Sequence, residues 1–230
     1  MLPDIMNEYT ETILDFEDDV LKDIRRLSAR DMDNVPILRK DAAALLSVLV
    51  TMHKPLKILE AGTAVGYSAI LLARFCLEAL SDEEKKEFRI DTVELSEERT
   101  LVALKNIERA GLSSYIRVIN GDAVEVFNCI GGQYDMVFVD SSKGHYIEMY
   151  DDMKRLLKTG GLLVCDDVIF YGKINDDPKE APHKHRTIVG RLRAFLDKLA
   201  ADKDFVTSLI DTGDGMAIAV KKGNLSYDNE

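Results

Sequence analysis

Cysteines and long apolar runs are both scarce in this chain of 230 residues. The three cysteines, Cys76, Cys129 and Cys165, lie far apart and form no CxxC pair, which offers no zinc site and is typical of reduced thiols in a cytoplasmic protein. No run of about 18 uncharged apolar residues occurs, so we expect no membrane span. Residues 1–4 carry no basic group, and a secretory signal is not expected.

Metal-binding histidine motifs are absent as well. The four histidines, His53, His145, His183 and His185, show no HExxH or similar spacing, and we interpret none of them as a zinc ligand. A divalent metal would therefore have to be held by oxygen ligands.

Net positive charge is also lacking, since the formal charge is −11 and the pI is about 4.9. This excludes a protein that coats nucleic acid by bulk charge. The charge is uneven, however: residues 1–34 hold ten acidic and four basic residues, whereas residues 183–198 hold five basic residues and one acidic residue. A small basic surface is therefore compatible with the acidic total.

Apolar periodicity predicts alternating helices and strands from residue 35 onward. Seven strands are expected, two of them at the C-terminal end and joined tightly through Gly213-Asp214-Gly215, so that they form a hairpin. The remaining strands alternate with helices, which predicts an α/β fold with a mostly parallel sheet and helices on both faces. The expected strands are residues 56–61, 88–95, 115–119, 134–139, 162–165, 205–210 and 216–220.

The first 34 residues read as a separate acidic helical extension. Apolar residues recur there at spacings of three and four, the pattern of one helix face. We therefore expect an extension over residues 1–34 and one α/β domain over residues 35–230. The other expected helices are residues 38–52, 67–80, 97–110, 123–130, 146–157 and 188–201, and a turn at Gly160-Gly161 is expected to follow the helix over 146–157.

A glycine-containing turn follows the first strand. Parallel sheets bind ligands at the carboxyl ends of their strands, and Glu60 to Gly66 lies at such an end before a helix. The third glycine of a dinucleotide motif is missing, and Glu60 is a poor neighbour for phosphate. It suits a cationic ligand such as S-adenosylmethionine, although a plain tight turn remains an alternative reading of this motif.

Acidic residues follow four more strands. Glu94 could take both ribose hydroxyls of a nucleoside or be a surface residue, and Asp122 could meet an adenine edge or cap the next helix. Asp140, Asp166 and Asp167 would converge at one sheet edge, where three like charges favour a hard divalent cation, most plausibly Mg²⁺. Helix capping and ordinary turn use are their alternatives.

These segments together resemble metal-dependent class I O-methyltransferases of the catechol and caffeoyl-CoA type. The resemblance covers most of the chain and depends on the order of its motifs: Lys57 to Ser68, Gly121-Asp122-Ala123, Phe138 to Tyr146, Asp166 to Gly172, and Gly213 to Ala217. It implies a Rossmann-like fold and transfer of a methyl group from S-adenosylmethionine to a substrate oxygen, with Mg²⁺ orienting the acceptor.

The resemblance also implies residue roles. Lys143 falls at the catalytic lysine and would take or share the acceptor proton, with Asp140 beside it. Asp140, Asp166 and Asp167 fall at the metal positions. The residues implied at the cofactor are Leu38, Glu60, Gly62, Ser68, Glu94, Asp122, Ala123 and Asp140. The family usually has Asp-Asn where this chain has Asp166-Asp167, so its cation would meet one more negative charge.

Within this family, the chain further resembles bacterial tRNA 5-hydroxyuridine methyltransferases, in Gly62 to Ile70 and in the basic stretch from His183 to Arg193, for which a solvated helix face is the alternative. Arg186 and Arg193 would contact the anticodon loop of tRNA, and the product would be 5-methoxyuridine at the wobble position. The alternatives are an enzyme acting on small catechol or phenolic acceptors and, in another class, a non-catalytic S-adenosylmethionine-binding protein. The resemblance further implies a homodimer, which periodicity does not test.

Overall fold

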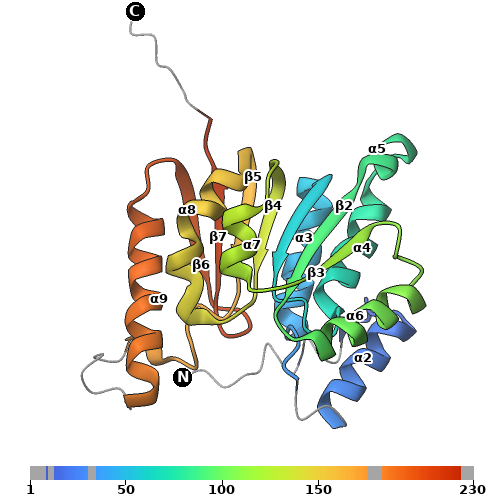
Figure 1. The fold of residues 1–230 in the computed structure, drawn as a ribbon, viewed down its shortest axis with the longest axis horizontal. Coiled ribbons are helices and arrows are strands. Elements are labelled where there is room, and N and C mark those ends of the chain that lie inside the picture. The colour runs from blue at the N-terminus through green and yellow to red at the C-terminus, as the bar shows by residue number, and fades with distance from the viewer. Residues whose placement is uncertain (1–8, 10–12, 31–34, 176–182, 224–230) are drawn as a thin grey trace, which may run out of the picture. The chain divides into compact units, whose positions relative to one another are not determined.

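The computed structural model describes residues 9, 13–30, 35–175 and 183–223. In these ranges the strands number seven and form the mixed α/β sheet that the sequence predicts, with helices around it (Figure 1). The chain divides into two compact units, Met1–Ala123 and Val124–Glu230. None of the described helices combines the length and the apolar character needed to cross a bilayer.

The first unit contains three parallel strands in the order β3-β2-β1. Ala61 of β1 pairs with Val93 of β2, and Glu94 of β2 pairs with Asn120 of β3, so the three carboxyl ends are level. The elements of this unit are α2 (Asp19–Arg30), α3 (Lys40–His53), β1 (Lys57–Ala61), α4 (Tyr67–Ala79), α5 (Asp82–Glu87), β2 (Arg89–Glu94), α6 (Glu97–Arg109) and β3 (Ile116–Asn120).

The second unit contains four strands in the order β4-β5-β7-β6. β4 and β5 are parallel, whereas β7 runs antiparallel to both β5 and β6, which confirms the predicted C-terminal hairpin. The elements are α7 (Ala123–Cys129), β4 (Tyr134–Val139), the 3-10 turn η1 (Lys143–His145), α8 (Tyr146–Leu156), β5 (Leu157–Cys165), the 3-10 turn η2 (Lys173–Asn175), α9 (His183–Ala201), β6 (Phe205–Ile210) and β7 (Met216–Lys221).

Strand β5 is longer than its apolar pattern indicates. The predicted strand began at Leu162, but β5 begins at Leu157 and includes Gly160 and Gly161, which were expected to form a turn. The pairing with β4 is irregular where these residues are accommodated, since Tyr134 pairs with Leu157 and Met136 pairs with Leu162. A bulge absorbs the extra residues, and Gly160 adopts the φ of +78° that glycine tolerates.

The leading segment is not one continuous helix. Residues 14–18 are non-helical, and α2 begins at Asp19, with the carboxylate of Asp18 accepting a hydrogen bond from Leu21 N at 2.9 Å. Residues 1–8, where the expected helix started, lie outside the described residues. α2 packs against α4 and α6 of the first unit. The domain boundary at residue 35 stays a prediction.

Two further element boundaries differ from expectation. α5 was missed because it is short and has no apolar face, yet Ser81 and Glu84 form a capping box that marks its start. α9 begins at His183 rather than at residue 188, so residues 183–198, which hold the five basic residues, lie within this helix. Its buried positions include Leu192 and Phe195, as the apolar spacing predicts.

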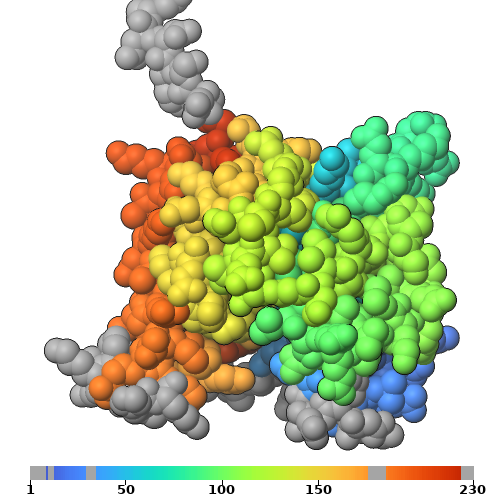
Figure 2. All heavy atoms as spheres, in the orientation of Figure 1, coloured from blue at the N-terminus to red at the C-terminus, as the bar shows by residue number. Residues whose placement is uncertain are grey.

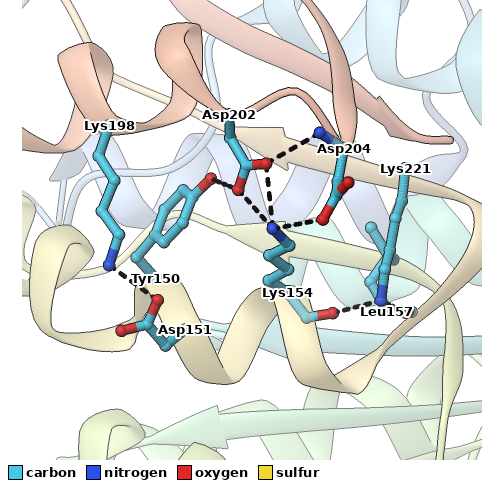
Figure 3. Close-up of polar contacts among 8 residues, drawn as sticks. All are labelled: Tyr150, Asp151, Lys154, Leu157, Lys198, Asp202, Asp204 and Lys221. Carbon is cyan, nitrogen blue, oxygen red and sulfur yellow. Dashed lines mark hydrogen bonds and ion pairs between the residues drawn. The ribbon is translucent and has the colours of Figure 1, made fainter.

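A network around Asp202 fastens the end of α8 to the connection between α9 and β6 (Figure 3). Tyr150 Oη donates to the Asp202 carboxylate at 2.7 Å, and Lys154 Nζ donates to both of its oxygens at 2.7 and 3.0 Å. Asp204 N donates to Asp202 Oδ1 at 2.9 Å. Burial alone would raise the pKa of Asp202, but these hydrogen bonds outweigh it and lower that pKa to about 2.

We expect Asp202→Asn to lower the free energy of unfolding at pH 7 by about 1–3 kcal/mol, because charge-assisted hydrogen bonds are lost. The contribution of Asp202 should be complete above its ordinary pKa of about 3.9 and lost as the pH falls toward 2. Denaturant melts of both proteins from pH 7 to pH 2 measure this difference.

Asp151→Asn is the matched control. Asp151 pairs with Lys198 at 2.7 Å, but its side chain is 84% exposed, so its loss should cost less than about 1 kcal/mol. Equal effects of the two substitutions at pH 7 would contradict the role assigned to Asp202.

Candidate active site

The turn after β1 has a backbone that requires glycine. Gly62 and Gly66 have φ values of +103° and +90°, a region that side-chain-bearing residues rarely adopt, and Ala64 between them is at +47°. Gly62 N donates to Val93 O at 2.9 Å, which bends the chain away from the strand. The turn leads directly into α4, whose first backbone N–H groups have no partner within the helix and can meet an electronegative ligand atom.

Glu60 supports this turn from inside the unit. Its side chain is fully buried, and the hydroxyl of Thr92 donates to its carboxylate. Thr92 is in turn 2.6 Å from the hydroxyl of Thr63, which belongs to the turn itself. The carboxylate that the sequence assigned to a cationic ligand therefore also holds the turn against β2.

Glu94 fastens the same turn from the end of β2. One carboxylate oxygen accepts from Ala64 N at 2.8 Å and the other from Ser96 N at 2.9 Å. Each oxygen keeps further acceptor capacity. The structure thus brings Glu60, Gly62 and Glu94 together around one turn, and their contact with a cofactor stays a prediction.

The other cofactor residues expected in the first unit lie on neighbouring segments. Ser68 is buried in the first turn of α4, and Leu38 is buried just before α3. Asp122 and Ala123 follow Gly121, whose N–H donates to Glu94 O at 2.9 Å. Their contact with a cofactor stays a prediction.

In the second unit, Lys143 joins two of the predicted acidic residues. Its ammonium nitrogen lies 2.8 Å from Asp140 Oδ1, at the end of β4, and 2.8 Å from Asp167 Oδ2, after the end of β5. Burial alone would lower the pKa of Lys143, whereas Tyr146, Asp140 and Asp167 raise it, and the net direction is upward. Lys143 is therefore held as a cation in this arrangement, not as the neutral amine that a general base requires.

Asp166 is the buried member of the acidic group, with 3% exposure. Burial, followed by the charges of Asp140 and Asp167, raises its pKa to about 8. Its Oδ1 has no hydrogen-bond partner among the described residues. A buried carboxylate oxygen of this kind is costly unless a donor or a cation meets it.

The assignment of Asp140, Asp166 and Asp167 to a metal ion stays a prediction. In the part of the chain that the structure describes, no three His, Cys, Asp or Glu side chains are grouped to hold a metal ion. Lys143 instead pairs with both Asp140 and Asp167 and compensates part of their charge. The donor chemistry nevertheless fits a hard divalent cation, because it is all oxygen and includes the unpartnered Asp166 Oδ1.

Tyr146 is a residue of this site whose role was not assigned from the sequence. Its fully buried hydroxyl lies 3.1 Å from Val139 O and 3.0 Å from Asp166 O, at the ends of β4 and β5. The available signal was a tyrosine on the apolar face of α8, since a buried phenol needs a hydrogen-bond partner. Tyr146 keeps the two strand ends at a fixed separation.

The loop after β5 is held by the β6–β7 connection. Asp167, Phe170 and Tyr171 all have positive φ values, between +50° and +56°. The carboxylate of Asp214 accepts from Tyr171 N at 2.7 Å, and Val168 N donates to Gly215 O at 2.9 Å. Strained backbone of this kind persists only where neighbours impose it, and such loops cluster at functional sites.

The basic residues of α9 are largely engaged within the unit. Arg193 Nε donates to Ile174 O at 2.6 Å, and Arg191 pairs with Glu148 at 2.7 Å. Arg186 is exposed, on a helix that forms part of the molecular surface (Figure 2). The side chains of His183 and Lys184 lie outside the described residues. Contact of Arg186 and Arg193 with tRNA stays a prediction.

Known proteins are similar to this chain over nearly its whole length. A family model described as O-methyltransferase matches residues 10–222. A catechol O-methyltransferase from Niastella koreensis is 31% identical over 226 residues, covering 94% of this chain and 96% of that protein. Caffeoyl-CoA O-methyltransferase 2 from Petunia hybrida is 27% identical, covering 88% and 83%. The O-methyltransferase from Bacillus cereus, solved in complex with SAH, is 26% identical with a TM-score of 0.79, covering 95% and 97%.

The mixed seven-stranded sheet and the glycine turn after β1 define a Rossmann-like α/β methyltransferase fold. The chain belongs to the O-methyltransferase family, which confirms the family resemblance of its motifs. Two of these relatives are named as a catechol and a caffeoyl-CoA O-methyltransferase, and the third is named as an O-methyltransferase without an acceptor. The tRNA subfamily assignment stays a prediction.

Gly215 offers a test of the loop contact. A Cβ added there would lie 2.2 Å from Ile169 Cγ1 at a φ of +85°, whereas one added at Gly172, φ +76°, meets nothing within 4 Å. We expect Gly172→Ala to cost about 1 kcal/mol through backbone strain alone. Gly215→Ala should cost at least about 2 kcal/mol, because overpacking against Ile169 is added.

Denaturant unfolding of the two variants beside the unsubstituted protein measures both costs. Equal destabilisation by the two substitutions would show that the Ile169 side chain moves aside at no measurable cost. That result would contradict a rigid loop after β5.

Proposed function

We propose that this protein transfers the methyl group of S-adenosylmethionine to a hydroxyl oxygen of a small catechol or phenolic acceptor, with a divalent cation. Family membership and the catechol O-methyltransferase relative support this acceptor class. The Bacillus cereus relative in complex with SAH supports the methyl donor.

The observation that carries the proposal is the group of charged side chains at the ends of β4 and β5. Asp140 and Asp167 lie 2.8 Å from Lys143, and Asp166 beside them is buried with an unpartnered oxygen. A protein that only binds a cofactor has no need for this buried concentration of charge. An O-methyltransferase that uses a divalent cation would use it to hold an acceptor oxygen and to accommodate its proton.

In the first unit, the glycine turn and Glu94 would bind the methyl donor. Gly62 and Gly66 let the backbone approach a ligand closely, and the free acceptor capacity of Glu94 suits ribose hydroxyls. Transfer forms the oxygen–carbon bond as the sulfur–carbon bond breaks, and the sulfonium becomes a neutral thioether. Binding both reactants in one orientation removes most of the entropic barrier to this displacement.

In the second unit, Asp140, Asp166 and Asp167 would hold the cation. When bound, Mg²⁺ supplies Lewis-acid polarisation of two adjacent acceptor oxygens and lowers the pKa of the hydroxyl. Lys143 is anchored on Asp140 and Asp167 in the arrangement described, and it would give up part of this pairing. Beside a bound divalent cation the ammonium form of Lys143 would be disfavoured, so Lys143 would release its proton to solvent and, as the neutral amine, take or share the acceptor proton.

We expect methyl transfer from labelled S-adenosylmethionine to catechol, caffeate or caffeoyl-CoA, dependent on Mg²⁺ and abolished by EDTA. Lys143→Met should lower kcat/KM by about 100-fold or more, the usual effect of losing a positioned proton-transfer group. The matched control is Lys158→Met, because Lys158 also pairs with an aspartate, Asp135, at 2.6 Å in the same unit. It should stay within about twofold of the unsubstituted enzyme, as expected for a surface ion pair.

Bulk tRNA from cells lacking this protein belongs in the same acceptor panel. 5-Hydroxyuridine offers O5 and the O4 carbonyl as a chelate comparable to catechol, and an unpaired wobble base is accessible. Label that enters tRNA as 5-methoxyuridine, with none in the phenolic acceptors, would overturn the proposed acceptor class. Cofactor binding without transfer to any acceptor would favour a non-catalytic binding protein.

Asp167 lies where the family usually has asparagine, and its charge should affect the metal. We expect Asp167→Asn to weaken Mg²⁺ binding about 5- to 50-fold, because one carboxylate charge is removed from a partly buried site. Isothermal titration of both proteins with Mg²⁺ measures this without turnover. Equal affinities would remove Asp167 from the proposed ligands.

A further inference from the structure

Arg25 of α2 connects two segments that lie far apart in the sequence. Its terminal nitrogens donate to Leu38 O at 3.3 Å, just before α3, and one of them donates to Tyr67 Oη at 2.5 Å. Tyr67 is the first residue of α4, directly after the glycine turn. The ribbon of α2 lies beside those of α4 and α6 (Figure 1).

Glu17 completes the cluster and balances its charge. Arg25 Nε lies 2.7 Å from Glu17 Oε1, and the Tyr67 hydroxyl donates to the same carboxylate oxygen. The Arg25 guanidinium is also 4.8 Å from the centroid of the Tyr67 ring. The side chain of Glu17 is 5% exposed and Tyr67 is 2% exposed, so these interactions are made largely away from solvent. Buried charges of this kind hold a single geometry strongly.

Other ion pairs of the same segment differ in kind. Asp18 pairs with Arg74, and Asp23 pairs with Arg109, at side chains that are 36–46% exposed. Pairs like these attach α2 to the unit and contribute little to its geometry. The buried contacts of Arg25 are instead made with Leu38, which is one of the predicted cofactor residues, and with Tyr67, which directly precedes another, Ser68.

We infer that Arg25 is a positioning residue for the methyl donor, an inference that rests on the proposed function. Leu38 is itself one of the expected cofactor contacts, and Ser68 follows Tyr67. By binding the Leu38 carbonyl and the Tyr67 hydroxyl with one planar group, Arg25 sets the separation between the segment before α3 and the start of α4. Glu17 fixes the orientation of that group.

Coupling of this kind is reciprocal. If the Arg25 contacts raise affinity for the methyl donor, then donor binding must stabilise the Arg25 contacts by the same free energy. Backbone amides of α2 should therefore exchange hydrogen more slowly when SAH is bound, even though Arg25 touches no donor atom in this scheme. A role of α2 in stability alone predicts protection no greater than the general stabilisation that ligand binding gives to amides exchanging by global unfolding.

The test is calorimetric binding of SAH, which needs neither acceptor nor metal. Arg25→Lys keeps a positive charge beside Glu17 but loses the planar fork, and we expect SAH affinity to fall about 5- to 10-fold. Tyr67→Phe keeps the ring and loses only the hydroxyl, and it should lower affinity in the same direction. Arg26→Ala is the control, because Arg26 pairs only with exposed Asp23 among the contacts described for it, and affinity should change less than twofold.

Hydrogen exchange of the same proteins separates positioning from folding. We expect SAH to protect the amides of α2 in the unsubstituted protein and to protect them less in Arg25→Lys. Unchanged SAH affinity in both Arg25→Lys and Tyr67→Phe would overturn the inference, as would affinity losses without any protection of α2 in the unsubstituted protein. Failure of the unsubstituted protein to bind SAH would instead overturn the proposed function.

Discussion

A carboxylate withdrawn from water needs donors or a cation inside the protein, and both units of this chain are arranged around that requirement. Glu94 takes two backbone N–H groups, one of them from the glycine turn. Glu17 pairs with Arg25 and accepts a hydrogen bond from the Tyr67 hydroxyl. Asp140 and Asp167 share Lys143. In each case, compensating the charge also fixes the position of a segment that the proposed chemistry uses.

Asp166 is the exception to this compensation. Among the described residues its Oδ1 has no hydrogen-bond partner, and burial raises the pKa of this carboxyl, so a donor or a cation near that oxygen would offset the cost of burying it. The surrounding backbone is correspondingly constrained: Tyr146 spans the ends of β4 and β5, and Asp214 holds the left-handed loop that follows. The left-handed backbone of this loop is locally unfavourable, and it persists because the hydrogen bonds around it impose it.

The strands and their ends could be predicted closely from the sequence because each depends on local apolar runs. The predicted element boundaries were wrong where contacts with distant segments outweighed the local sequence pattern. The glycines at 160 and 161 read as a turn but lie within β5, because pairing with β4 accommodates them as a bulge. The leading segment read as one helix, yet Asp18 starts a new helix and Glu17 lies inward against Arg25.

Periodicity and motifs predict the fold class, the order of the strands along the chain, the family and the residues at the strand ends, because both are carried by neighbours in the chain. The partners of those residues, by contrast, are defined by the folded arrangement. Lys143 as a cation between two carboxylates, Tyr146 between two strand ends, and Arg25 between Leu38 and Tyr67 are such cases. Charge compensation depends on distances in space, and residues 42 positions apart come into contact only once the chain has folded.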